Sequence, residues 1–180
     1  MKTYVITLSK FFPAGHTRAG EPTRFRCAFL QGRDFCPDCT TTCNYDSDEI
    51  RSRGRTCSRN LWKYRKLHTI RANYDLWAAR IAEVEAGRAC LSIRQWAGKP
   101  YRSPQIEIGR LTHADGIGIQ KLEIRTPFAF TIDDMLHDPQ TLELQLAHND
   151  GLSLDDWRGW FKGDKSKAMA IIHFTNFRYE

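Results

Sequence analysis

The stretch Lys66–Trp77 reads KLHTIRANYDLW, and it decides how the rest of the chain is interpreted. It places basic, hydroxyl, amide and acidic side chains around one short apolar run. A segment that only built a hydrophobic core would not carry so many hydrogen-bonding groups. We therefore interpret its first half as the floor of a site.

The second half of this stretch predicts a helix. Asn73 is a suitable N-cap, Asp75 lies in the first turn, and Gly87 provides a C-terminal stop. Apolar residues recur at three- and four-residue steps on one face: Tyr74, Trp77, Ile81 and Val84.

Length and composition are those of a folded domain. The chain has 180 residues, of which 41% are hydrophobic, so we expect one domain over 1–180 and not a disordered tail. Lys and Arg number 27 against 21 Asp and Glu, and the net charge of +6 favours anionic partners, nucleic acid first. Apolar runs are far shorter than the roughly 20 residues that span a bilayer, and the N-terminus does not resemble a signal peptide, so we expect a cytoplasmic protein.

Segments with period-two alternation predict several short strands. The expected strands are Tyr4–Leu8, Cys90–Trp96, Gln105–Leu111, Ile117–Arg125, Phe128–Ile132 and Ala168–Tyr179. In the fourth of these the apolar phase slips between Ile119 and Leu122, which predicts a bulge. Thr141–His148 fits a strand or a helix, and Ser153 begins a further helix. The pattern predicts an α+β fold, a small mixed β-barrel with two to three flanking helices.

A Cys-rich insertion over 26–62 interrupts this pattern and lacks periodicity. Its cysteines at Cys36, Cys39, Cys43 and Cys57 are spaced as a structural zinc site could be, and zinc would order a segment without its own core. Cys27 or His16 could replace Cys57. Unligated thiols are the main alternative to zinc, and disulfides are disfavoured in a cytoplasmic protein. Cys90 lies within a predicted strand, and we expect it to be a buried thiol.

Basic and aromatic residues alternate around the turn Gly98-Lys99-Pro100. This group comprises Arg94, Gln95, Trp96, Lys99, Tyr101 and Arg102. Arg and Lys neutralise phosphate, Gln can read the edge of a base, and Trp or Tyr can stack on an unpaired base. Burial of Trp96 in the barrel is the structural alternative. His68 is a further candidate for a polar contact, although a hydrogen-bonded strand histidine is more common.

Three separated pieces of the chain resemble the ASCH domains of the PUA-like superfamily. The first piece, Lys66–Arg71, matches the K-x-x-T-I-R signature of that family. The second is Asn149–Ser153 followed by Asp156-Trp157, which is similar to the segment that leads into the late helix of the family. The third, Ala170–Phe174, is similar to its closing strand. The run Leu91–Gln105 also resembles ASCH-like proteins of phages and Bacteroidetes. The resemblance covers roughly residues 66–179 and implies a small β-barrel associated with RNA and modified nucleosides.

Some ASCH proteins are amidohydrolases that deacetylate N4-acetylcytidine, and the resemblance transfers their residues to this chain. Lys66 and Thr69 then correspond to the catalytic Lys and Thr, and Asp150 stands where the family has Glu. A Lys can activate a Thr hydroxyl, a carboxylate can orient the pair, and Arg71 can hold an anionic group. Asp150 is one methylene shorter than Glu, so its carboxylate reaches less far from the backbone.

These observations support three hypotheses. The first is RNA or modified-nucleoside binding through a basic cleft lined by Lys66, Thr69, Arg71, Arg94, Lys99, Arg102 and Asp150. The second makes the same cleft an amidohydrolase site for N4-acetylcytidine-type substrates. The third is an interaction protein that docks a partner through the Cys-rich insertion. Sequence does not decide between RNA, DNA and a nucleoside, and it leaves the oligomeric state open.

Overall fold

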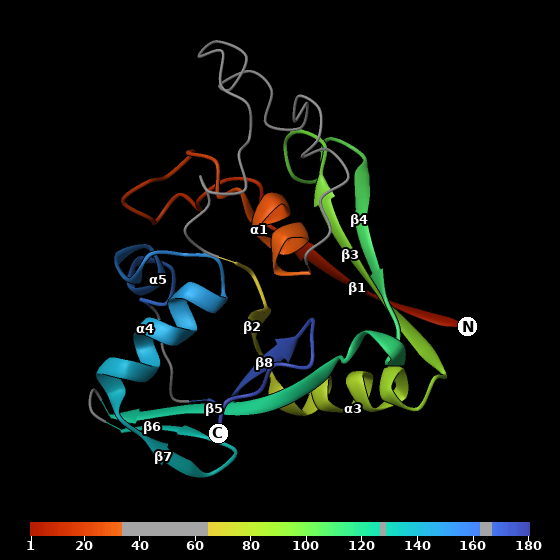
Figure 1. The fold of residues 1–180 in the computed structure, drawn as a ribbon. Helices are drawn as coiled ribbons and strands as arrows, with labels where there is room; N and C mark the ends of the chain where they lie inside the picture. Colours follow the sequence, from red (N-terminus) through yellow and green to blue (C-terminus); the bar gives the residue numbers. More distant parts are fainter. Residues whose placement is uncertain (34–64, 127–128, 163–166) are drawn as a thin grey trace.

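The computed structural model describes residues 1–33, 65–126, 129–162 and 167–180, and these form an α+β fold (Figure 1). The strands are β1 (Lys2–Leu8), β2 (His68–Ala72), β3 (Ala89–Trp96), β4 (Gln105–Leu111), β5 (Gly118–Thr126), β6 (Ala129–Ile132), β7 (Met135–His137) and β8 (Met169–His173). The α-helices are α1 (Phe25–Gly32), α3 (Tyr74–Glu85), α4 (Pro139–Asn149) and α5 (Leu154–Trp160), with a short 3-10 helix η3 (His113–Asp115). The described ranges therefore hold four α-helices, where two to three were expected.

The strands form two separate sheets. One has the order β1-β3-β4, with β1 parallel to β3, and the other has the order β2-β8-β5-β6-β7 with antiparallel neighbours. Edge strands β1 and β2 are linked by a side chain, because Arg71 Nη2 donates to the Thr7 carbonyl at 2.7 Å. Neither sheet closes into a barrel within the described part of the chain, so the expected barrel is not confirmed.

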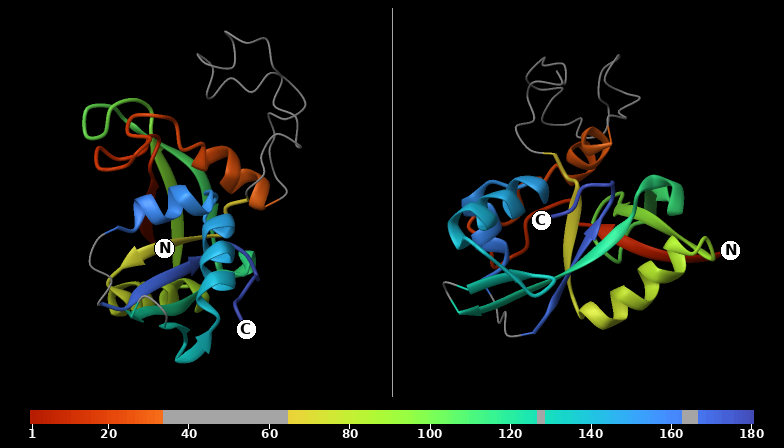
Figure 2. Two further views of the ribbon diagram at one scale, coloured as in Figure 1. Left: turned by 90° about the vertical axis from the view of Figure 1, so that its left-hand side faces the viewer. Right: turned by 60° about the horizontal axis from the view of Figure 1, so that its bottom comes forward.

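Helices cover both sides of the five-stranded sheet (Figure 2). Helix α3 packs against β5, β8 and β3, whereas α4 contacts β6 and α5. The apolar face that the sequence predicts for α3 is the buried face of this helix, because Trp77, Ile81 and Val84 are all buried in the core. The central strand β8 is buried at every position, as its apolar sequence indicates.

Side-chain caps explain where three helices begin. Asn73 Oδ1 accepts from Leu76 N at 3.2 Å at the start of α3, which confirms the predicted cap. The Ser153 hydroxyl accepts from Asp156 N at 3.1 Å at the start of α5. The ambiguous segment Thr141–His148 lies within helix α4, because Asp138 caps that helix and Pro139 occupies its first turn.

Helix α1 packs into the core. Phe25, Phe29 and Leu30 are all buried, so residues 26–32 of the predicted insertion 26–62 form a packed helix, and the rest of that range up to residue 62 lies outside the described residues apart from Arg33. The end of α1 lies against Lys66, whose N–H donates to the Ala28 carbonyl at 2.9 Å. A Cβ atom at Gly32 would lie 2.6 Å from Lys66 O, so only glycine allows this approach.

Helices of the described ranges are too short or too polar to cross a membrane. This agrees with the absence of long apolar runs in the sequence.

Candidate functional site

Lys66 and Asp150 form a buried ion pair. They face each other in an isolated antiparallel bridge, and their residues are 1% and 4% exposed. Lys66 Nζ donates to the Asp150 carboxylate and, at 2.7 Å, to the Asp150 carbonyl. The ring centroid of Phe25 lies 3.9 Å from the same nitrogen. The ammonium group is thus enclosed by α1, the end of α4 and its carboxylate partner.

Burial moves both members of this pair toward their neutral forms. Desolvation lowers the pKa of the Lys66 amino group, while attraction to Asp150 opposes that shift. Desolvation likewise raises the pKa of the Asp150 carboxyl group, and Lys66 opposes it. Arg71 is close enough to favour the ionised carboxylate and to disfavour the charged Lys66.

Thr69, the third residue assigned by the resemblance, is buried in β2 at 5% exposure. No hydrogen bond joins its hydroxyl to Lys66 or Asp150 among the described residues. Strand alternation places Thr69 on the same face of β2 as Arg71 and opposite His68. The structure therefore brings Lys66 and Asp150 into direct contact, whereas no hydrogen bond joins Thr69 to that pair among the described residues.

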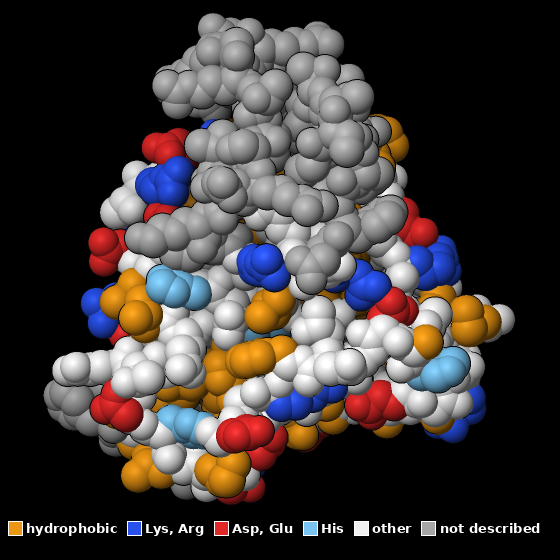
Figure 3. Space-filling model, viewed as in Figure 1, with side chains coloured by type: hydrophobic (Ala, Val, Ile, Leu, Met, Phe, Trp, Pro, Cys, Tyr) orange, Lys and Arg blue, Asp and Glu red, His pale blue; other side chains and the backbone are white. Residues whose placement is uncertain are grey.

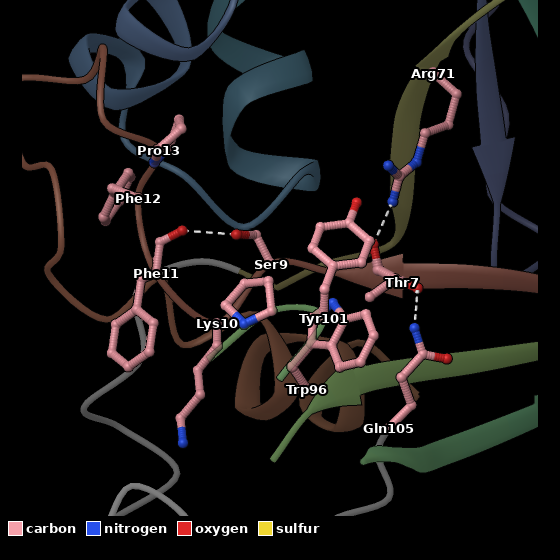
Figure 4. A pocket seen from close by; sticks show the side chains of 11 residues that line it. Thr7, Ser9, Lys10, Phe11, Phe12, Pro13, Arg71, Trp96, Tyr101 and Gln105 are labelled. Atoms are coloured by element: carbon pink, nitrogen blue, oxygen red, sulfur yellow. Dashed lines mark hydrogen bonds between the residues drawn. The ribbon is translucent and has the colours of Figure 1, made fainter. Parts of the chain in front are cut away.

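An open cleft of about 570 Å³ lies beside Arg71 (Figure 4). It is bounded by the end of β1, the segment that follows β1, and the loop between β3 and β4. Its lining residues are Thr7, Ser9, Lys10, Phe11, Phe12, Pro13, Arg71, Trp96, Pro100, Tyr101 and Gln105. Arg71 belongs to the cleft, whereas Lys66, Thr69 and Asp150 do not line it.

Hydrogen bonds hold the two walls of the cleft together. Lys10 Nζ donates to the Ala97 carbonyl at 3.0 Å, and Gln95 Nε2 donates to the Ser9 carbonyl at 3.4 Å. Gln105 Nε2 donates to the Thr7 hydroxyl at 3.2 Å. The segment after β1 and the β3–β4 loop are thus fixed to each other, and the cleft between them has a defined shape.

Two aromatic rings form one wall. The ring centroids of Trp96 and Tyr101 are 5.2 Å apart with an interplanar angle of 52°. Tyr101 is 90% exposed and has a φ of 61°, a left-handed conformation that is uncommon for a non-glycine residue. Trp96 is half-buried and lines the cleft, so the alternative of full burial in a barrel is wrong for this residue. An exposed ring held at a loop tip offers a flat apolar face to a ligand.

The basic residues of the sequence motif lie around this loop. Arg94 is half-buried and donates from Nε to the Ser92 hydroxyl at 2.9 Å, while Lys99 and Arg102 are exposed. Within the described ranges none of the three forms an ion pair with a carboxylate. Arg94 lies opposite Glu107 on β4, whose carboxylate it helps to keep ionised, whereas Lys99 and Arg102 project from the loop. On the face drawn in Figure 3, basic and acidic side chains are interspersed over the described residues. The positive charge of Lys99 and Arg102 therefore favours the loop beside the cleft as the place for an anion.

His68 lies in a different place, within a closed polar cluster at 0% exposure. Its Nε2 is 2.8 Å from the Tyr179 hydroxyl, which also accepts from Asn149 Nδ2 at 3.0 Å. The His173 ring stacks edge-on against His68, with centroids 5.7 Å apart. His68 is thus the hydrogen-bonded strand histidine of the alternative interpretation, and it does not line the cleft.

Both histidines of this cluster are held in the neutral form. Burial, followed by the neighbouring His173 and Lys66, lowers the pKa of His68 well below its usual value. Burial, followed by Arg178, lowers the pKa of His173 to about 3. His68 Nδ1 and both ring nitrogens of His173 have no hydrogen-bond partner in the described structure. Protonation of either ring would therefore place an unsolvated charge in the core.

The predicted zinc ligands Cys36, Cys39, Cys43 and Cys57 lie outside the described residues, so the zinc site stays a prediction. The described ranges contain no group of three or more His, Cys, Asp or Glu side chains that could hold a metal. His16, one of the substitutes for Cys57, is buried and bonds through both nitrogens, to Asp156 O at 2.9 Å and to Arg18 N at 3.0 Å. Cys90 is buried, as expected.

The sequence interpretation missed the N-terminal wall of the cleft. Lys10, Phe11 and Phe12 line this wall and lie two to four residues beyond the predicted strand Tyr4–Leu8. A Lys followed by two Phe is the same combination of basic and aromatic residues that occurs around Trp96 and Tyr101. That signal was present in residues 9–13, but nothing in the sequence indicated that this segment meets the β3–β4 loop.

Comparisons with protein-family models, with curated proteins and with solved structures gave no match to this chain. The site must therefore be interpreted from its own geometry.

Proposed function

We propose that this protein binds single-stranded RNA or a nucleoside in the cleft between Arg71 and the β3–β4 loop. The observation that carries the proposal is the wall formed by Trp96 and the exposed Tyr101 beside Lys10 and Arg71. Unpaired bases are bound by stacking on aromatic rings while cations neutralise the phosphates.

The size of the cleft supports a ligand of this class. Its volume of about 570 Å³ lies within the range of roughly 300–1,000 Å³ that is usual for small-molecule sites. Ser9, Thr7 and Gln105 place hydroxyl and amide groups on its lining, which can bond to base edges. The exposed Lys99 and Arg102 lie on the same loop as Tyr101, where they can meet the phosphates of a longer strand.

The direct test is fluorescence anisotropy with a labelled RNA of about ten nucleotides, single-stranded or in a duplex. If Arg94, Lys99 and Arg102 each neutralise one phosphate, the logarithm of the association constant falls with the logarithm of salt concentration with a slope of about −2. We expect the single strand to bind more tightly than the duplex. A lack of binding at low salt would reject the proposal.

Variants of exposed residues separate stacking from charge without disturbing the fold. Tyr101→Ala should weaken binding by about 1–3 kcal/mol, the range for one stacked base, whereas Leu136→Ala removes another exposed apolar side chain, on β7, and should have no effect. Lys99→Ala should reduce the salt slope, and Arg88→Ala, at the opposite end of β3, should not. Equal effects of test and control variants would contradict the cleft assignment.

A second candidate function is hydrolysis of N4-acetylcytidine-type amides, which the ASCH resemblance of Lys66–Arg71 implies. The contact between Lys66 and Asp150 favours it, because burial moves both pKa values toward the range useful for proton transfer. The enclosing ring of Phe25 would have to move before a substrate could reach Lys66.

Incubation of the protein with N4-acetylcytidine, followed by chromatography, tests this candidate. If it is correct, cytidine accumulates, and Thr69→Ala and Lys66→Ala each abolish its formation. Unchanged turnover in a folded Thr69→Ala protein would refute the assignment of the nucleophile.

A further inference from the structure

Arg71 differs from the other cations of the cleft in how its guanidinium is held. Its Nη2 donates to the Thr7 carbonyl at 2.7 Å, which fixes the group between β2 and β1 (Figure 4). Its Nε–H is buried and has no hydrogen-bond partner in the part of the chain that is described. A fixed guanidinium with an unsatisfied donor is a preorganised site for an oxygen acceptor.

The charges around Arg71 do not balance. Lys66 and Arg71 are two cations near one carboxylate, Asp150, and that carboxylate is already bonded to Lys66. No carboxylate within the described ranges forms an ion pair with Arg71. Burial lowers the pKa of Arg71, and attraction to the Asp150 carboxylate only partly opposes that shift. One positive charge at the wall of the cleft is therefore left for a ligand to neutralise.

We propose that Arg71 forms an anion subsite that binds a phosphate group, so that the cleft selects nucleotides over nucleosides while the base stacks on Tyr101 and Trp96. This inference rests on the proposed nucleic-acid function of the same cleft. Phosphate is favoured over other anions because a guanidinium forms strong charge-assisted hydrogen bonds to phosphate oxygens, and because the neighbouring aromatic wall fits a base.

Calorimetric titration of the wild-type protein with a nucleoside and with its 5′- and 3′-monophosphates tests the subsite without any variant. Repeating the titration with each of the four bases identifies the base whose nucleoside and monophosphates bind most tightly. We expect at least one monophosphate to bind roughly 10- to 100-fold more tightly than its nucleoside, the gain of a hydrogen bond to a charged group. Inorganic phosphate should compete with the monophosphate and not with the nucleoside.

Substitution of Arg71 assigns the preference to this side chain. Arg71→Gln should reduce the ratio of monophosphate to nucleoside affinity to about one, whereas Arg71→Lys keeps a cation and should retain part of the ratio. Tyr101→Ala is the matched control, because it should weaken both ligands equally and leave the ratio unchanged. Thermal unfolding of each variant shows whether the link to Thr7 is still needed for folding.

The outcomes separate this inference from the function on which it rests. If single-stranded RNA binds but every nucleoside binds as tightly as its monophosphates, the Arg71 subsite is wrong and the RNA proposal stands. If folded Arg71→Gln keeps the full preference, the phosphate lies elsewhere and the subsite is again wrong. If neither RNA nor any monophosphate binds, both proposals fall together.

Discussion

The ion pair of Lys66 with Asp150 and the cleft beside Arg71 are built on the same short segment, but they satisfy their charges differently. In the pair, the ammonium has a carboxylate, a carbonyl and a ring around it, and solvent has no access. In the cleft, the guanidinium has one carbonyl and an open space of about 570 Å³. A charge that is satisfied within the protein supports the fold, whereas a charge that is left over at an open surface is available to a ligand.

The largest expected effect comes from breaking the buried pair. Lys66→Met leaves the Asp150 carboxylate in the core without its counterion, which should lower the free energy of unfolding by about 3–5 kcal/mol. Urea denaturation followed by circular dichroism measures this loss. The double variant Lys66→Met/Asp150→Asn removes both charges and should recover a large part of it. The exposed control Lys99→Ala should stay within about 0.5 kcal/mol of the wild type. If Lys66→Met lowered the free energy of unfolding no more than Lys99→Ala does, the ion pair would not be structural.

Acid should destabilise the protein through the histidine cluster, by an intermediate amount. The folded-state pKa of His68 and of His173 lies below the unfolded value of 6.5. Their contribution to the free energy of unfolding is therefore fully present above pH 6.5 and is lost as the pH falls toward the folded-state pKa. At about pH 5.5 the expected loss is roughly 1.4 kcal/mol for each histidine. Urea denaturation between about pH 7.5 and about pH 5.5 measures this loss.

Substitution of one histidine provides the control for this pH dependence. His173→Phe keeps a ring beside Phe177 and Tyr179 and should remove about half of the dependence. An unchanged dependence in that variant would exclude His173 as a source. Affinity for RNA in the cleft should change less than stability over the same range, since neither histidine lines it.

The smallest effect is expected at Thr69, which lies between the two regions. Thr69→Ser removes one methyl group from a buried strand position and should cost about 1 kcal/mol of stability. Its hydroxyl bonds to neither Lys66 nor Asp150 in the described structure, and it does not line the cleft, so RNA affinity should be unchanged in the anisotropy assay. A large loss of affinity would mean that the cleft extends to Thr69 when a ligand is bound.

Six of the eight described strands and helix α3 could be predicted from sequence because their apolar patterns and caps are local, whereas β2 and β7 were not among the predicted strands. Helix α4 was left ambiguous, although Asp138 before Pro139 is a start signal for a helix. The predicted bulge in β5 is absent at that point, since Ile119 to Leu122 pair regularly with β8. Gln120 takes the buried position there, because its amide bonds to both backbone groups of Tyr179, at 2.8 and 3.0 Å.

The candidate site was predictable in part. Lys66 and Asp150 were paired through a resemblance to ASCH domains, and the structure places them in contact, but their complete burial depends on Phe25 and α1. Helix α1 was missed because the chain around it is polar and rich in Arg and Asp. The cleft depends on contacts between Lys10 and Ala97 and between Thr7 and Gln105, which no local pattern encodes.

The close approach of Gly32 to the Lys66 carbonyl has a consequence for the connectivity of the chain. Gly32 and Lys66 are in contact although residues 34–64 lie between them in the sequence. Because the entropy of closing a chain segment grows only slowly with its length, adding or removing residues between these two points changes the closure entropy little. In evolutionary terms, chain closure therefore places little constraint on the length of this cysteine-containing sequence, whereas the contact at Gly32 tolerates no larger side chain.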